Sequence, residues 1–316
     1  IGSIDDGTTV MDYLDEERER GITIISAAAV FPWHEHEFHL IDTPGHIDFT
    51  AEVERSLRVI DGAVVIFSAV EGVEAQSEKV WRQADRYRVP KIAFINKLDR
   101  VGALFERVLQ EIREKFETPA IPLQIPVGIE DDFSSLIDLR TMQRLDFNGD
   151  TNERVEAGPI PDDLLADAEQ HRSSMLELLA DESDEIAEKY LEGEELTPEF
   201  LDAHIAALTK ANRVVPVLAG SAKQRLGVQP LMDAVAAYLP SPNELDPIPG
   251  VHPKKNTPLT VPPNDPTADF AGLIFKVVAT SSADLLYLRI YSGTLRKGDK
   301  VVNTRSGETV RIKQLL

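Results

Sequence analysis

FHLIDTPGHID, residues Phe38–Asp48, joins a short apolar run to a turn of small and polar residues. The apolar run predicts a buried β-strand, and Asp42 would stand at its carboxyl end. Because open α/β sheets bind ligands beyond the carboxyl ends of their strands, the stretch predicts an α/β fold with a site beside Asp42. The alternative interpretation is an ordinary strand-to-helix turn in which Asp42 is a helix cap.

The turn after this strand suits a phosphate group. Thr43, Pro44 and Gly45 end the strand, and the backbone N–H of Gly45 can approach a terminal phosphate oxygen because the residue has no Cβ. His46 follows directly, and its imidazole could orient or polarise an attacking water molecule. The turn therefore predicts a sensor of a terminal phosphate, with His46 as the catalytic residue.

A second apolar run, VPKIAFINKLD at Val89–Asp99, also ends in polar residues. The carboxylate of Asp99 can accept hydrogen bonds from the N1 and N2 donors of guanine, a pair that adenine lacks. Lys97 would lie over the base, and Asn96 would tie neighbouring loops together. The pattern is weak alone, but two such strand ends in this order, with a helix between them, favour a guanine nucleotide over ATP.

Two shorter motifs complete the predicted site. Thr23, in the segment ERERGITI, offers a hydroxyl oxygen of the kind that Mg²⁺ prefers when nucleotide phosphates share the ion. Thr23 could equally open the strand that follows it. In the loop GSAK, Ser221 and the backbone of Ala222, followed by Lys223, could fix the base from its other side, and an ordinary loop is the alternative.

The four motifs in this order resemble the translational GTPases, and elongation factor G in particular. The resemblance continues in further segments, among them IDDGTTVMDYLDEERERGITI, GVQPLMDAVAAYLPSP and YLRIYSGTLRKGDKV. The ribosome-recycling paralogue and the tetracycline-resistance ribosomal protection proteins share most of these motifs, so the sequence leaves the member of the family open. The resemblance implies GTP and GDP as ligands, Mg²⁺ bound near Thr23 and Asp42, and GTP hydrolysis that moves or disassembles the ribosome.

Apolar strands that alternate with helical patterns predict a doubly wound, mainly parallel sheet like that of P-loop GTPases. Residues 1–242 would form this GTPase domain, interrupted at about 131–210 by a mainly helical, acidic insertion. Prolines crowd residues 243–267, which predicts a stiff linker between domains. Residues 268–316 are rich in short β patterns and resemble the start of domain II of translational GTPases, an antiparallel barrel that would be incomplete here.

The sequence contains no Gly-Lys pair and therefore no GxxxxGK[ST] loop to hold the α and β phosphates. By the family resemblance this loop would precede Ile1, which is not a methionine, so we expect the sequence to be a fragment. Such a piece should bind GTP weakly and hydrolyse it poorly. The rival interpretation is a non-catalytic scaffold that lacks the loop by nature and works through its acidic insertion.

Charge is distributed unevenly along the chain, whose net charge is −21. Residues 131–200 contain 21 Asp and Glu against five Lys and Arg, which predicts either a solvated face or, by the resemblance, the surface that meets the ribosomal stalk protein. By the family resemblance, the basic residues near the end would suit ribosomal RNA, and an ordinary barrel surface is equally compatible with them; these residues are Lys297, Lys300, Arg305 and Arg311. With no cysteine and no apolar run of membrane-spanning length, we expect a cytoplasmic protein without a membrane span. The family resemblance implies that it binds the ribosome, and we expect a monomer that binds neither DNA nor a membrane.

Overall fold

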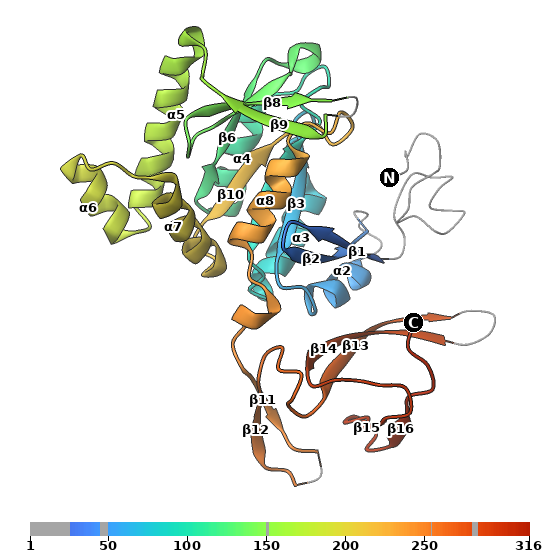
Figure 1. The fold of residues 1–316 in the computed structure, drawn as a ribbon. Helices are drawn as coiled ribbons and strands as arrows, with labels where there is room; N and C mark the ends of the chain where they lie inside the picture. Colours follow the sequence, from blue (N-terminus) through green and yellow to red (C-terminus); the bar gives the residue numbers. More distant parts are fainter. Residues whose placement is uncertain (1–25, 45–49, 150–151, 254, 280–283) are drawn as a thin grey trace. The chain divides into compact units, whose positions relative to one another are not determined.

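The computed structural model describes residues 26–44, 50–149, 152–253, 255–279 and 284–316. The chain divides into two compact units, Ile1–Leu239 and Pro240–Leu316 (Figure 1). No helix among the described residues is long and apolar enough to cross a membrane.

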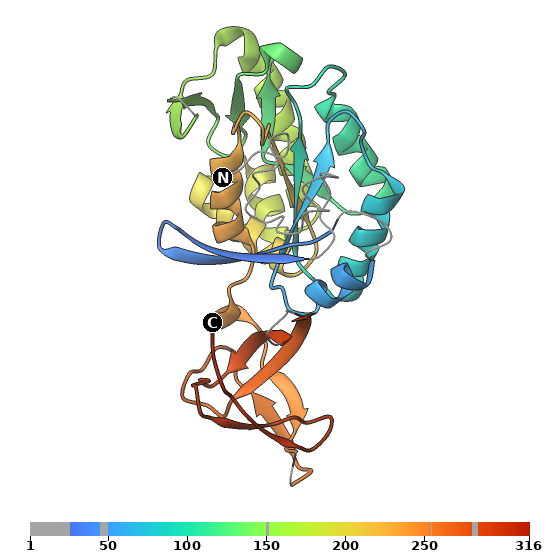
Figure 2. The same ribbon diagram turned by 90° about the vertical axis from the view of Figure 1, so that its right-hand side faces the viewer.

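A four-stranded parallel sheet forms the centre of the first unit, as the alternating pattern predicted. In spatial order its strands are β3 (Ala63–Ser68), β4 (Lys91–Asn96), β10 (Val215–Ala219) and β5 (Ala120–Pro122). Residues 91–95 and all of β10 are buried, because a parallel sheet is covered on both faces. Figure 2 shows the sheet between the blue and cyan helices on one side and the orange helix on the other.

The helices that cover the parallel sheet are amphipathic and pack their apolar faces against it; we call the sheet and these helices the parallel layer. They are α2 (Thr50–Leu57), α3 (Ala75–Arg86), α4 (Phe105–Phe116) and α8 (Val228–Tyr238). Trp81 of α3 is 1% exposed and stacks on Phe116 of α4 with ring centroids 4.2 Å apart, so it belongs to the core, as expected. Lys91 is buried beside it, and its ammonium group donates to Asp85 at 2.6 Å.

The strand that ends at Asp42 belongs to a two-stranded hairpin and is not the buried sheet strand that we expected. β1 (Ala27–Trp33) and β2 (His36–Asp42) pair antiparallel, and within the described residues β2 pairs with no other strand. Leu40 is therefore 48% exposed, since a two-stranded ribbon leaves much of both faces uncovered. Asp42 ends a hairpin strand and not a strand of the parallel sheet, which corrects that prediction.

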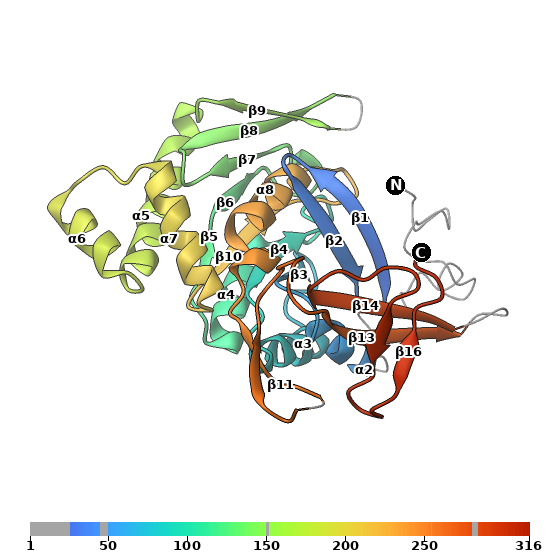
Figure 3. The same cartoon turned by 60° about the horizontal axis from the view of Figure 1, so that its bottom comes forward.

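A second sheet, which the sequence did not predict, begins in the chain directly after β5. Its antiparallel strands lie in chain order (Figure 3): β6 (Gln124–Val127), β7 (Ser135–Asp138), β8 (Gln143–Asn148) and β9 (Arg154–Gly158). The chain changes sheets at Leu123, between β5 and β6. The N–H of Leu123 donates to Val217 in the parallel sheet at 3.0 Å, and its carbonyl accepts from Leu139 at 2.9 Å.

The rest of the insertion is helical, as predicted. Its helices are α5 (Asp162–Ala180), α6 (Asp184–Glu192) and α7 (Pro198–Lys210). Ser183 and Thr197 cap α6 and α7 with their side-chain oxygens, and Gly193 ends α6 in the left-handed conformation. Apolar residues of each helix join the main core, so the acidic residues are left for the outer faces.

The second unit contains a short 3₁₀ turn, η3 (Pro242–Glu244), and three separate two-stranded antiparallel sheets. These pair β11 (Ile248–Val251) with β12 (Pro258–Val261), β13 (Ala271–Ala279) with β14 (Asp284–Ser292), and β15 (Lys300–Val302) with β16 (Thr309–Arg311). The described strands do not close into a barrel, in agreement with the predicted incomplete barrel. The proline-rich segment differs from a plain extended linker, because it contains the β11–β12 hairpin.

Candidate functional site

Two loops lie side by side where β4 and β10 end. We call residues 96–104 the first base-reading loop and residues 220–227 the second. The N–H of Gly220 donates to the carbonyl of Ile95 at 3.0 Å, and the N–H of Leu98 donates back to Gly220 at 3.3 Å. The side-chain Oδ1 of Asn96 accepts the N–H of Ala222 at 2.8 Å. Asn96 therefore ties the two loops together, as its position in the sequence suggested.

The second base-reading loop is closed by its own hydrogen bonds. Ser221 and Leu226 exchange backbone bonds of 2.9 and 3.0 Å, and the hydroxyl of Ser221 accepts the N–H of Gln224 at 3.2 Å. A Cβ at Gly220 would clash with the carbonyl of Leu226, so only glycine fits this approach. Ser221 is completely buried, while Lys223 is exposed to solvent.

Asp99 and Lys97 are the residues of the first base-reading loop that the sequence predicts to contact the base. The Oδ1 atom of Asp99 is buried, and no described group donates a hydrogen bond to it. A buried carboxylate oxygen without a donor costs stability, so a ligand with N–H groups would satisfy it. Lys97 has a positive φ of 65° and is half-exposed, and its ammonium group lies 3.4 Å from Oε2 of Glu71.

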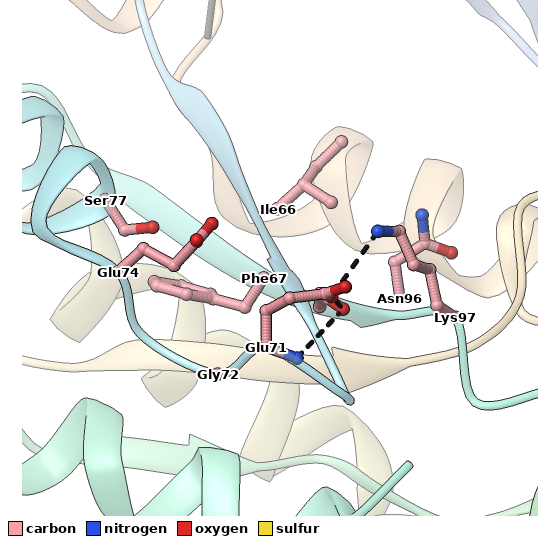
Figure 4. A pocket seen from close by; sticks show the side chains of 9 residues that line it. Ile66, Phe67, Glu71, Gly72, Glu74, Ser77, Asn96 and Lys97 are labelled. Atoms are coloured by element: carbon pink, nitrogen blue, oxygen red, sulfur yellow. Dashed lines mark hydrogen bonds and ion pairs between the residues drawn. The ribbon is translucent and has the colours of Figure 1, made fainter. Parts of the chain in front are cut away.

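Two adjoining hollows open beside these residues, and both include Glu71 and Lys97. The larger, of about 690 Å³, lies within the size range of small-ligand pockets. Its lining residues are Val70, Glu71, Lys97, Asp99, Arg100, Val101, Asp131, Lys223 and Gln224. The smaller, of about 440 Å³, extends over the end of β3, where Figure 4 shows Lys97 reaching toward Glu71.

This arrangement fits a guanine base. The free acceptor of Asp99 suits the paired N1 and N2 donors of guanine, and the aliphatic stem and charge of Lys97 suit the face of the ring. The N–H of Ala222 is engaged by Asn96, so a contact of Ala222 with the base would have to share that hydrogen.

The structure brings together only part of the predicted site. Asn96, Lys97, Asp99 and the triplet Ser221, Ala222 and Lys223 meet at one edge of the sheet. Asp42 ends the separate hairpin, followed by half-buried Thr43 and buried Pro44. Thr23, Gly45 and His46 lie outside the described residues. Within the described part of the chain, no group of three or more His, Cys, Asp or Glu could hold a metal ion.

Two residues that line the larger hollow were missed by the sequence reasoning. Glu71 lies in the turn that follows β3, so its place beyond the carboxyl end of a parallel strand was a usable signal. Asp131 comes from the short 3₁₀ turn η2 (Glu130–Asp132) between β6 and β7. No local pattern could indicate Asp131, because its position depends on the antiparallel sheet that the sequence did not predict.

Comparison with known proteins finds a domain family and several relatives that are similar to this chain. Residues 2–241 match the family model of the elongation factor Tu GTP binding domain. Over the whole chain, the sequence is 47% identical to elongation factor G 2 of Syntrophus aciditrophicus. It is 46% identical to each of the elongation factor G proteins of Fervidobacterium nodosum and Thermotoga neapolitana. The chain spans about half the length of these curated relatives, namely 47%, 46% and 46%.

A solved structure agrees with this match. A crystal structure of a protein from Thermus thermophilus superposes with a TM-score of 0.81 at 27% sequence identity, over 98% of this chain and 43% of that one.

Proposed function

This chain belongs to the family of the elongation factor Tu GTP binding domain, and from that premise we propose that the full-length protein is a ribosome-associated GTPase of the elongation factor G kind. The family expected from the four sequence motifs is thereby confirmed. In the proposed function, GTP hydrolysis drives movement or disassembly of the ribosome.

One observation carries the proposal at the atomic level. The Oδ1 atom of Asp99 is buried and receives no hydrogen bond from the described part of the chain, and it lies beside a hollow that Lys97 and Lys223 also line. Guanine would supply the missing donors, while an adenine base offers no such pair to a carboxylate. Asn96 supports this interpretation, because its bond to Ala222 holds the two base-reading loops together around the same hollow.

The phosphate end of the nucleotide would be served by two segments, the one around Thr23 and the one around Gly45, which we propose to act as switches. Gly45 would donate its N–H to the γ-phosphate, and His46 would orient the attacking water once the ribosome orders the site. Thr23 and Asp42 offer the oxygen ligands that Mg²⁺ prefers, and the bound ion would neutralise charge on the phosphates. Loss of the γ-phosphate would release both switches, since they are held only while it is present.

The proposed partners follow from the distribution of charge. The acidic segment 131–200 would meet the ribosomal stalk protein. The basic residues of the second unit would contact ribosomal RNA. We further propose that the protein is monomeric and acts in the cytoplasm.

Exchanging the acceptor of Asp99 for a donor tests the proposed function. In Asp99→Asn, the preference of the full-length protein should shift from GDP toward XDP, because xanthine presents a carbonyl where guanine has its N2 amine. Competition between the two nucleotides against a fluorescent GDP analogue measures the shift. Asp246→Asn, a change of the same kind at an exposed site of the second unit, is the control. Unchanged base selectivity in Asp99→Asn would contradict the proposal.

A further inference from the structure

We propose that two residues in the turns of the antiparallel sheet hold the two base-reading loops in place and thereby set how slowly guanine nucleotide is released. They are Glu130, between β6 and β7, and Asn152, between β8 and β9. Below, the insertion means this sheet and the helices α5 to α7. Neither residue belongs to a nucleotide-binding motif of the sequence. The inference rests on the proposed function, because it assigns positioning residues to the same guanine site.

Glu130 holds the first base-reading loop by a hydrogen bond, and we call such a bond from the insertion to a loop a brace. Its Oε1 atom accepts the backbone N–H of Gly102 at 2.8 Å. Gly102 is linked to Asp99 through a short turn, in which the N–H of Arg100 donates to Lys97 at 3.1 Å and the N–H of Ala103 donates to Arg100 at 3.1 Å. A displacement of Gly102 would therefore be transmitted to the carboxylate that reads the base.

The backbone around Glu130 is shaped for this contact. Glu130 has a positive φ of 53°, an uncommon conformation for a residue with a side chain. Gly128 before it has a φ of 80°, and a Cβ there would clash with the carbonyl of Asp132. Backbone strain of this kind persists only where the surrounding structure enforces it, and here it directs Glu130 toward the first base-reading loop.

Asn152 braces the second base-reading loop from the turn between β8 and β9. Its Nδ2 donates to the carbonyl of Gln224 at 2.8 Å, and Gln224 lines the larger hollow. The carbonyl of Asn152 in turn accepts from Nε2 of Gln229 on α8 at 2.7 Å. Asn152 therefore connects the second base-reading loop, the insertion and α8 by direct hydrogen bonds.

The two braces act on different loops of one assembly. Asn96 joins the base-reading loops to each other, while Glu130 and Asn152 each join one loop to the insertion. Asp131, the neighbour of Glu130, lines the hollow itself, so the insertion forms part of the wall around the base. Loosening either brace would lower the barrier for the loops to part, and a bound nucleotide would leave faster.

The test measures dissociation of a fluorescent GDP analogue from the full-length protein by stopped flow. Asn152→Ala and Glu130→Ala should each release the nucleotide about two- to tenfold faster, the range expected for loss of one hydrogen bond. The double variant should be faster than either single variant. Glu130→Gln keeps an acceptor for Gly102 and should restore slow release, whereas Asn152→Asp places an acceptor against the carbonyl of Gln224 and should not.

Base selectivity separates positioning from a general loss of stability. Inosine lacks the N2 amine of guanine, so the ratio of GDP to IDP affinity reports on Asp99. Glu130→Ala should reduce this ratio at least about twofold, because it frees the loop that carries Asp99. A change in folding stability alone would leave the ratio unaltered.

Matched control variants remove bonds of the same kind elsewhere. Asn212→Ala removes a bond from Nδ2 to the carbonyl of Arg88, of 3.1 Å, outside both base-reading loops. Glu244→Ala removes an acceptor that the N–H of Ser241 reaches at 2.8 Å in the second unit. Both controls should release GDP at the wild-type rate.

The outcomes distinguish the inference from the proposed function. Unchanged release and unchanged selectivity in Asn152→Ala, Asn152→Asp and Glu130→Ala, with wild-type binding of GDP, would overturn the inference alone. Failure of the wild-type protein to bind guanine nucleotides would overturn the proposed function, and the inference with it. If an alanine variant fails to fold, as judged by circular dichroism, the release rate of Asn152→Asp decides the question: faster release supports the inference, and the wild-type rate overturns it.

Discussion

Arg140 is a half-buried cation at which three parts of the first unit meet. Its guanidinium donates to both carboxylate oxygens of Asp138 on β7, to Asp202 on α7 and to the hydroxyl of Tyr238 on α8. Burial lowers the pKa of Arg140, but the neighbouring carboxylates outweigh it, so the pKa is raised above its ordinary value. Arg140 therefore stays charged and joins the insertion to the last helix of the parallel layer.

Removing this cation should be costly. Arg140→Ala would leave Asp138, only 5% exposed in its side chain, without its counter-charge, and we expect a loss of about 3–5 kcal/mol in unfolding free energy. Urea unfolding measures the loss. Arg55→Ala, which removes an exposed ion pair with Glu52, should cost about 1 kcal/mol or less. Equal effects of the two substitutions would show that the buried cluster is not a stabilising junction.

His46 provides the prediction that separates chemistry from binding. In the full-length protein, His46→Ala should abolish ribosome-stimulated GTP turnover, because no imidazole would then orient the water, and it should leave GTP affinity nearly intact. Single-turnover hydrolysis with ribosomes, together with equilibrium titration, measures both quantities. A large loss of affinity would instead assign His46 to holding the nucleotide.

At the residue scale, the sequence predicted the groups whose partners are close in the chain. Asn96, Lys97 and Asp99 share one loop, so their relation follows from local spacing alone. Glu71 and Asp131 reach the same hollow only after β3 and the insertion have folded around it. Their roles therefore depend on tertiary contacts that no short window of sequence contains.

At the element scale, a histidine with a raised pKa links two helices of the first unit. His171 of α5 contacts Glu106 of α4 at 3.3 Å, and its Nδ1 lies 2.9 Å from the carbonyl of Asp167. The hydrogen bond to Glu106 raises the pKa of His171 to about 9, although burial works against this shift. The protonated imidazole thus links a helix of the insertion to a helix of the parallel layer.

The sign of the resulting pH dependence follows from linkage. Since the pKa of His171 is higher in the folded state than its ordinary 6.5, the stabilisation is complete below about pH 6.5 and is lost as the pH rises through about 9. We expect a contribution on the order of 1 kcal/mol, because Glu106 is largely exposed. Urea unfolding from pH 6 to 9.5 should show a smaller stability difference between wild type and His171→Gln at high pH. A difference that stays constant over this range would contradict the assignment.

At the element scale, the sequence predicted strands whose burial is continuous and missed features that the residue pattern of one segment does not show, although the strands concerned pair with their neighbours in the chain. β4 and β10 are short apolar runs between breakers, so their type was readable. β8 mixes apolar residues with Arg144 and Asp146, which pair with each other at 2.7 Å, and its pattern resembles a loop. The exposure of β2 was unpredictable for the same reason, because it depends on which strand lies beside it.

For the whole molecule, the two units differ in the apolar surface that they bury. Every buried apolar side chain recorded among the described residues lies in the first unit, which ends at Leu239. In the second unit, the cross-strand partners Val277 and Leu286 are each 57% exposed. The boundaries proposed from the sequence, at 242 and 267, remain predictions.

Hydrogen exchange should report this difference directly. Amides of β4 and β10 should exchange only through global unfolding, whereas amides of β13 and β14 should exchange through local opening, roughly tenfold faster or more. Exchange followed by mass spectrometry on the 316-residue chain resolves these segments. Similar protection of both pairs of strands would mean that the second unit is stabilised by contacts that its burial does not reveal.

The change of sheet at Leu123 limits how this molecule can be re-engineered. Residues 120–122 complete the parallel sheet, and the next residues start the insertion without any spacer. If the insertion were cut out together with Leu123 and transferred to another protein, the hydrogen bond from the N–H of Leu123 to the carbonyl of Val217 would be lost. A viable graft must retain Ala120–Leu123 in the host and splice only beyond that point.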